Sequence, residues 1–401
     1  MAYDLSSPEF LANPGPTLAA MRAKGALVQV KLPFVGLTWM TTTDAAARQL
    51  LKSPELFGRD PLQGTGKTLA QKYWYFPPFV KLLFQNMLGF DGAEHARLRG
   101  LVELAFNKTS IDDMRPRLVQ IADDLLDRID TSQPVDIIRI YTRPLPLMAI
   151  CDLLGVPQGD RSQVARWIGP LSGPTNAWGM ARGLPGLWRI MRYFRTDFDR
   201  VRRHPRPGVI TDLVQAEAAG NRLSDDELLA MVVTLFVAGH ETTIHLITMG
   251  IFGLLTQPDA RESMRNNPAK LPLLIEEFMR FYSPVMMTKP HFVRADTEFE
   301  GVSLTKGDQI AALLIAANHD GARFDTPDHL IPDRRPNAHL GFGHGPHVCL
   351  GMQLARAEAQ VALTQLFTRF PDLRLANPDA PPRYAKRVGI HGLTELNLRL
   401  T

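Results

Sequence analysis

The chain has 401 residues, of which 45% are hydrophobic and 21% are charged, a composition that is ordinary for a globular protein. The net charge is only +4 and no Lys or Arg block is long, which argues against a nucleic-acid partner. Two cysteines, Cys151 and Cys349, exclude a disulfide framework and are typical of a reducing compartment. The first residues carry no signal sequence, and no apolar run reaches the roughly 18 residues that span a membrane, so we expect a cytoplasmic protein without a membrane anchor.

The spacing of apolar residues predicts a mainly α-helical protein with a small β-rich region. We see no linker and expect one domain over residues 1–401. Residues 172–186, which include four Gly and two Pro, are expected to form a flexible connector. Helices are expected over residues 16–25, 44–51, 95–105, 111–129, 141–154, 159–170, 187–204, 225–255 and 352–370. Short strands are expected within residues 28–42, 284–287, 294–299, 302–304, 309–314 and 390–400.

Large apolar side chains crowd residues 73–90, on both sides of Pro77 and Pro78. Such a segment is either a loop that closes over an apolar pocket or a simple piece of the core. In the first case, Tyr75 and Phe76 are candidates to line the pocket.

Two charged pairs occur at helical spacing. His95 and Arg99 are four residues apart and therefore share a helix face. Glu277 and Arg280 are three residues apart on the helix that follows Pro272. Each pair alone is typical of a solvated surface and defines no site.

The longest predicted helix, over residues 225–255, opens with a capping box formed by Ser224 and Glu227. The sequence Ala238-Gly239-His240-Glu241-Thr242-Thr243 interrupts its apolar pattern. Glycine is costly inside a helix, and an acid beside two hydroxyl side chains is unusual in an apolar run. The interruption therefore indicates a functional segment within a core helix.

A short stretch near the C-terminus holds three glycines and a proline in the sequence Phe342-Gly343-His344-Gly345-Pro346-His347-Val348-Cys349-Leu350-Gly351. These residues predict a shaped loop, and strong helix formers follow it from Met352 onward. Backbone N–H groups and the helix dipole would favour a thiolate at Cys349, and a thiolate is a good axial ligand for haem iron. A lone cysteine by itself is more often an inert buried thiol.

The spacing of this loop resembles the haem-binding signature of the cytochrome P450 family, Phe-Gly-x-Gly-x-His-x-Cys-x-Gly. It is matched at Phe342, Gly343, Gly345, His347, Cys349 and Gly351. The interruption at residues 238–243 is similar to the family's Ala/Gly-Gly-x-Asp/Glu-Thr-Thr/Ser pattern, and both charged pairs also match in the family's order. The resemblance implies a cytochrome P450 fold, with a long central helix over the haem and the cysteine-ligand loop beneath it.

The resemblance also implies the cofactor and its contacts. The cofactor would be haem b (iron protoporphyrin IX), with Cys349 as the metal ligand and Phe342 packed near the sulfur. Propionate contacts would come from His95, Arg99 and His347. Further contacts with the cofactor are expected at Ala238, Gly343 and Gly351.

Catalytic roles carry over in the same way. Glu241 and Thr242 would deliver protons, and residues 238–243 would distort the helix beside the iron. Glu277 and Arg280 would form, with Arg334, a structural network that supports the cysteine loop. The substrate pocket is expected to include Thr234, Val237 and Ala238, with Met286, Met287, Ile390 and His391 as weaker candidates.

One position departs from the family. Many relatives carry a propionate-binding arginine five residues before the acidic residue that matches Asp296, and this chain has His291 there. If His291 contacts the propionate, a group that titrates near neutral pH replaces a permanent cation. The alternative is a surface histidine with no role at the cofactor.

The implied activity is a monooxygenase that hydroxylates or epoxidises an apolar small molecule with O2. Electrons would come from NAD(P)H through a reductase and a separate ferredoxin or flavodoxin, and we expect the protein to be a monomer. One alternative is a peroxygenase of the same fold, which uses hydrogen peroxide and usually lacks the acid–threonine pair that this chain has at Glu241 and Thr242. The other is a haem-binding sensor or a non-oxidative haem enzyme.

Overall fold

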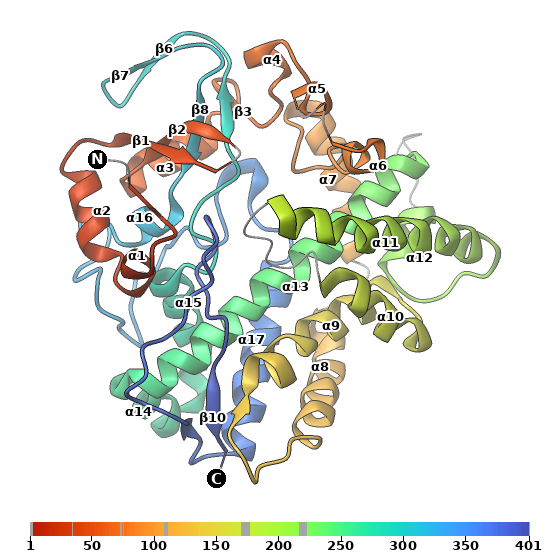
Figure 1. The fold of residues 1–401 in the computed structure, drawn as a ribbon, viewed down its shortest axis with the longest axis vertical. Coiled ribbons are helices and arrows are strands. Elements are labelled where there is room, and N and C mark those ends of the chain that lie inside the picture. The colour runs from red at the N-terminus through yellow and green to blue at the C-terminus, as the bar shows by residue number, and fades with distance from the viewer. Residues whose placement is uncertain are drawn as a thin grey trace.

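The computed structural model describes residues 3–33, 35–72, 74, 76–107, 111–169, 177–215 and 223–400. Helices make up most of the molecule and the strands are short, as the sequence predicts (Figure 1). The helices that precede the central one are α1 (Pro8–Ala12), α2 (Gly15–Arg22), α3 (Asp44–Lys52), α4 (Leu62–Thr65), α5 (Leu69–Lys72), α6 (Pro78–Leu82), α7 (Gly92–Asn107), α8 (Ile111–Leu126), η1 (Ile138–Thr142), α9 (Pro144–Leu154), α10 (Gln158–Ile168), α11 (Ala177–Arg203) and α12 (Val209–Gln215). The central helix and those after it are α13 (Asp225–Thr256), α14 (Pro258–Asn266), η3 (Pro268–Lys270), α15 (Leu271–Tyr282), α16 (Leu314–Asn318), η4 (Gly345–His347) and α17 (Met352–Arg369).

Helix α13 runs through the middle of the molecule and packs against α9, α11, α15 and α17 (Figure 1). The predicted capping box fixes its start: Ser224 Oγ accepts the N–H of Glu227 over 3.2 Å, and Glu227 Oε2 accepts the N–H of Ser224 over 2.7 Å. Most of its side chains are buried, so its length and apolar composition are those of a core helix. Every residue is α-helical, so residues 238–243 do not break the helix, and the expected local distortion there stays a prediction.

β-rich segments from near the N-terminus and from the later half of the sequence combine in one sheet. Its strand order is β1-β2-β8-β5-β3, with β2 and β8 parallel and the other neighbours antiparallel. A second sheet has the order β4-β10-β9, and β6 and β7 form a hairpin. The strands are β1 (Leu27–Leu32), β2 (Gly36–Thr41), β3 (Phe57–Gly58), β4 (Val135–Asp136), β5 (His291–Val293), β6 (Thr297–Phe299), β7 (Val302–Leu304), β8 (Gln309–Ala312), β9 (Arg374–Leu375) and β10 (Asn397–Arg399).

The expected flexible connector at residues 172–186 is wrong where the structure describes it, because α11 already begins at Ala177. The glycines serve packing there: Gly186 is buried, and a Cβ at this position would collide with the carbonyl oxygen of Trp167 in α10. The rest of that expected connector lies outside the described residues. The expected strand at residues 284–287 is only an isolated bridge between Val285 and Ile390, and the strand expected to reach residue 314 gives way to α16.

Candidate functional site

The loop that carries Cys349 is held in shape by its own backbone. The N–H of Cys349 donates to the carbonyl of Phe342 over 2.9 Å. Gly343 and Gly345 have φ angles of 74° and 71°, a region that other residues disfavour. A Cβ at Gly345 would also collide with the carbonyl oxygen of Leu51, in α3. These two glycines are therefore needed for the turn, and Gly345 also for the packing of the loop on α3.

Cys349 is accessible and lies just before α17. Removal from water raises the pKa of its thiol, and this effect outweighs the opposing influence of the Gly351 N–H and of the cations of Arg99 and Arg356. The polypeptide by itself therefore does not favour the thiolate, and the expected thiolate at Cys349 stays a prediction for the haem-bound protein. A metal ion reverses the balance, because coordination deprotonates a thiol outright.

Asp91, directly before α7, brings together residues from distant parts of the chain. Its carboxylate accepts the backbone N–H of Arg59 over 2.6 Å and pairs with Arg294 at 2.9 Å and with His347 at 3.3 Å. The rings of His95 and His347 lie 4.1 Å apart. The predicted propionate-binding histidines are thus neighbours in space.

Several buried nitrogens near Asp91 have no partner within the described part of the chain: His95 Nε2, His347 Nδ1, His291 Nδ1 and Arg59 Nε. His291 is 3% exposed, so the surface alternative for this residue is wrong. Burial lowers the pKa of His291 well below its ordinary value, and the charges of Arg59 and His347 lower it further. Unsatisfied buried polar groups are costly, so the concentration of these nitrogens here indicates a polar ligand, and the Arg59 Nε–H requires an acceptor oxygen from it.

Arg99, on α7, reaches the cysteine loop. Its Nη1 donates to the carbonyl of Val348 over 2.8 Å, and its Nε donates to Glu103 over 2.6 Å. Arg99 therefore anchors the loop at the residue next to Cys349. Its contact with a propionate stays a prediction.

One strip of α13 is accessible although the helix is largely buried. Thr234, Val237 and Thr242 are half-buried and Ala238 is exposed, and their spacing of three to four residues places them along one face. The hydroxyl of Thr242 donates to the carbonyl of Ala238 over 2.9 Å. Accessible surface on a core helix indicates a space that a ligand fills.

Glu241 is 9% exposed and forms an ion pair with Arg387 from the C-terminal segment. The pair holds the Glu241 carboxylate in one orientation, directly before Thr242 in the helix. Arg387 is a contact that the sequence did not predict.

Three of the other pocket candidates keep some accessible surface. Phe76 is half-buried, with its ring 6.4 Å from the ring of Phe84, and Met287 and Ile390 are also half-buried. Tyr75 lies outside the described residues.

Two weaker candidates, Met286 and His391, have side chains with almost no accessible surface. Met286 is 1% exposed and packs in the core beneath the larger sheet. His391 is 3% exposed, and its two ring nitrogens face the carbonyls of Tyr282 and Leu11. Both side chains are occupied by the interior of the protein, and their expected place in the pocket stays a prediction.

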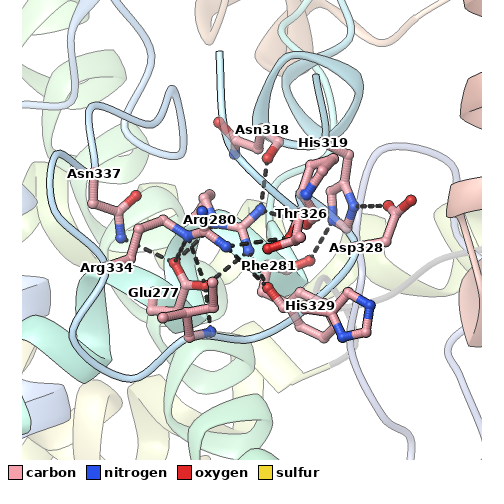
Figure 2. A network of polar contacts seen from close by, with 12 residues as sticks. Glu277, Arg280, Phe281, Asn318, His319, Thr326, Asp328, His329, Arg334 and Asn337 are labelled. Atoms are coloured by element: carbon pink, nitrogen blue, oxygen red, sulfur yellow. Dashed lines mark hydrogen bonds and ion pairs between the residues drawn. The ribbon is translucent and has the colours of Figure 1, made fainter. Parts of the chain in front are cut away.

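The three charged residues of the predicted structural network meet in the interior (Figure 2). Glu277 pairs with Arg280 at 2.8 Å and with Arg334 at 3.1 Å, and it also accepts the N–H of Ile331 over 2.8 Å. The two guanidinium groups donate to backbone carbonyls in residues 318–329 (Figure 2). The network therefore fixes the irregular segment that leads toward the cysteine loop.

A second link, from the neighbouring Glu276, joins α15 to α17. Both nitrogens of the Arg356 fork donate to Glu276 over 2.7 Å, and His339 lies 3.1 Å from the same carboxylate. Arg356 also lies over the ring of Phe342, 4.7 Å from its centroid. Glu276 and Arg356 thus hold the helix that follows Cys349 and one side of the loop.

These features define a mainly helical protein with a cysteine-bearing cofactor site beside its central helix. The family model for cytochrome P450 matches residues 189–391. The vitamin D(3) 25-hydroxylase of Pseudonocardia autotrophica is 35% identical over 93% of this chain and 90% of its own length. The mycinamicin IV hydroxylase/epoxidase of Micromonospora griseorubida is 37% identical over 92% of this chain and 91% of its own. The chain belongs to the cytochrome P450 family.

The fold agrees with this membership. The crystal structure of the myxobacterial cytochrome P450 CYP267B1 in complex with myristic acid superimposes with a TM-score of 0.90 at 34% identity, covering 99% of this chain and 98% of the other. Proteins of the family are oxidoreductases that bind haem b, so the predicted class of enzyme and the predicted cofactor are confirmed.

The residues present fit haem b. An accessible cysteine lies in a loop built by glycines, and the four buried nitrogens around Asp91 lack the acceptors that two propionates would supply. Asp91, Arg59 and Glu276 could not be identified from the sequence, because their partners lie far along the chain. From the sequence alone, an acid before a helix, such as Asp91, is interpreted as a helix cap. An arginine after a short strand, such as Arg59, is interpreted as a surface residue.

Proposed function

We propose that the protein is a haem-thiolate monooxygenase in which Cys349 ligates the iron and a small apolar molecule is hydroxylated or epoxidised. Two observations carry the proposal: an accessible cysteine in the glycine-rich loop, and an accessible strip on the core helix α13 that includes Thr242, the residue after Glu241. Bound haem supplies the activation of O2, of which one atom enters the substrate and the other leaves as water.

The residues of the chain stabilise the cysteine ligand and deliver protons. The Gly351 N–H donates to the sulfur of Cys349, which stabilises its thiolate form. Thr242 lies on the accessible strip with a hydroxyl that exchanges its bond to Ala238 for one to a ligand or water. Glu241, the residue before Thr242, has a carboxylate that can accept a proton and that forms an ion pair with Arg387. A hydroxyl beside an acid is the arrangement that a proton route toward bound oxygen requires.

The electron donor in this proposal is a ferredoxin or flavodoxin served by an NAD(P)H-dependent reductase. The support is the cofactor chemistry, because a monooxygenase consumes two electrons for each O2 and haem does not supply them. We further propose a cytoplasmic monomer; its two free cysteines, typical of a reducing compartment, support the location.

The substrate in this proposal is an apolar molecule of moderate size. Its support is the chemistry of the accessible side chains, which include Val237, Ala238, Met287 and Ile390. Relatives named for vitamin D(3) and for mycinamicin IV support the same class. Substrate-induced spectral shifts across a library of steroids, macrolides and fatty acids would rank its members.

Turnover with a surrogate ferredoxin and its reductase tests the activity. We expect product only when NAD(P)H, the ferredoxin and O2 are all present, with one oxygen atom of the product derived from O2. Product formed at the same rate from hydrogen peroxide alone would identify the peroxygenase instead. Haem binding without oxidation of any library member under either condition would favour the sensor.

A further inference from the structure

The ion pair of Glu241 and Arg387 joins α13 to the C-terminal segment, residues 383–396. Arg387 Nη1 donates to Glu241 Oε1, across 146 residues of sequence. Glu241 is buried and the side chain of Arg387 is 27% exposed, so solvent screens the pair only partly. A charge-assisted hydrogen bond in such a place fixes the acid more firmly than a surface ion pair would.

The backbone that carries Arg387 is itself fixed. The N–H of Ile390 donates to the carbonyl of Arg387 over 3.3 Å and closes a turn, and the N–H of Met286 donates to the carbonyl of Gly389 over 2.9 Å. Gly389 has a φ of 86°, a conformation that suits glycine, and Ile390 forms an isolated bridge with Val285. The guanidinium of Arg387 therefore extends from a defined turn toward Glu241.

The same segment also packs on α13 one helical turn further along, at His245. A Cβ built at Gly392 would lie 2.0 Å from His245 Nδ1, so the segment needs a glycine to lie this close to the helix. Burial lowers the pKa of His245 to about 4, and the charge of Arg387 lowers it further. His245 is thus neutral near pH 7 and cannot take the place of Arg387 as the cation beside Glu241.

This ion pair either only joins the segment to α13 or also orients an acid that takes part in the reaction. Its position favours the second role, because Glu241 directly precedes Thr242, which lies on the accessible strip. The other acids of α13, which the structure describes throughout, are in its first turn: Asp225, Asp226 and Glu227. A group that transfers a proton must be held within hydrogen-bond reach of the group it serves. The orientation of Glu241 therefore bears on proton transfer.

We propose that Arg387 is a positioning residue of the reaction, and that it holds Glu241 in the orientation from which protons pass to Thr242. The inference rests on the proposed function, since it adds Arg387 to the proton route of Glu241 and Thr242. Loss of the guanidinium leaves the cofactor bound but slows proton delivery. A larger share of the electrons from NAD(P)H then leaves as hydrogen peroxide, and a smaller share is used for product.

Arg387→Met should be compared, as a holoprotein with a surrogate ferredoxin system, with a matched control, Arg383→Met. Arg383 is in the same segment and pairs with Glu395 at 3.0 Å, but its side chain is 76% exposed. We expect the ratio of hydrogen peroxide to product to rise severalfold in Arg387→Met and to stay unchanged in the control. The solvent isotope effect on product formation should also rise in Arg387→Met alone, because slower proton transfer then limits the rate.

The double variant shows whether Arg387 acts through Glu241. If it does, Arg387→Met should change the peroxide ratio in the wild type but not in a protein that already carries Glu241→Gln. Equal changes in both backgrounds would overturn the proposal. So would normal coupling in Arg387→Met beside impaired coupling in Glu241→Gln. Normal coupling in Glu241→Gln itself would refute the proton route of the proposed function, which is a different failure.

Arg387→Lys tests the role of the charge. It restores a cation and should recover most of the lost coupling, whereas coupling as poor as in Arg387→Met would overturn the proposal. If Arg387→Met does not retain haem, Arg387→Gln, which keeps a hydrogen-bond donor without the charge, takes its place in every comparison. The carbon monoxide spectrum of each variant checks the cysteine ligation separately. Weaker substrate binding with normal coupling would assign Arg387 to the substrate pocket instead.

Discussion

The thiol of Cys349 experiences opposed influences. Burial raises its pKa, while the Gly351 N–H and the charges of Arg99 and Arg356 lower it. The residue is therefore prepared for a metal ion without being reactive on its own. The other cysteine, Cys151, is 1% exposed, and burial raises its pKa to about 12, so it provides an inert comparison.

Replacement of Cys349 by histidine should abolish the carbon monoxide spectrum of a haem-thiolate protein in the reduced state. The reason is that the imidazole donates less electron density to the iron than the thiolate does. Cys151→Ala should retain the spectrum. An unaltered spectrum in Cys349→His, or in a haem-retaining Cys349→Ala variant, would refute the proposed ligation.

Thr242→Ala should leave haem content and substrate binding nearly intact while hydrogen peroxide rises severalfold at the expense of product. The lost hydroxyl removes an ordered proton donor on the accessible strip of α13. Thr243→Ala is the matched control, because Thr243 is 3% exposed and bonds to the carbonyl of Gly239 over 3.2 Å. Equal coupling of NAD(P)H to product in the wild type and in Thr242→Ala would remove this role from Thr242.

At the scale of elements, Glu277 joins α15 to the segment that precedes the cysteine loop. Its side chain is fully buried and forms ion pairs with Arg280 and Arg334, and the side chain of Arg280 is also fully buried. Glu277→Gln should destabilise the protein by about 3–5 kcal/mol, because it leaves buried guanidinium charge without its partner. Urea unfolding followed by circular dichroism measures the change.

The control is the exposed pair of Arg369 and Asp127, whose acid side chain is 61% exposed. Asp127→Asn should cost less than about 1 kcal/mol, since solvent screens such pairs. Similar losses for Asp127→Asn and Glu277→Gln would show that burial does not strengthen the Glu277 network.

Glu276 links α15 to α17 and makes this part of the molecule sensitive to acid. Burial alone would raise the pKa of Glu276, but the hydrogen bonds from Arg356 and His339 outweigh it and lower the pKa to about 2 from an ordinary 4.5. A lowered pKa stabilises the folded state above the unfolded value, and that stabilisation disappears as the pH falls from 4.5 toward 2.

The free energy of unfolding of Glu276→Gln should therefore lie roughly 3 kcal/mol below that of the wild type at pH 6. The difference should shrink steadily below pH 4.5, the ordinary value for this group. Glu262→Gln, at an exposed site on α14, serves as the control. A difference that stays constant down to pH 3 would contradict the role of this ion pair.

At the scale of the whole molecule, the sequence predicted the features that depend only on residues close together in the chain. Local spacing found the cysteine loop, the capping box at Ser224 and most long helices. The prediction failed where a residue packs against a distant part of the chain. Gly186 was expected in a flexible connector, but its missing side chain allows α10 and α11 to approach each other. The lowered pKa of His291 could not be predicted either, because it depends first on burial by the folded chain and then on the charge of Arg59, which is far away in the sequence.

The hydrogen bond between Arg99 and Val348 spans 249 residues of sequence, and the pair of Asp91 and His347 spans 256. On the ribosome, the first half of the chain therefore emerges long before the partners that complete its cofactor site. Contacts between such distant residues form slowly, because a large loop must close first. We therefore expect haem to be captured late, only after the C-terminal part of the chain has been synthesised and has met the first half.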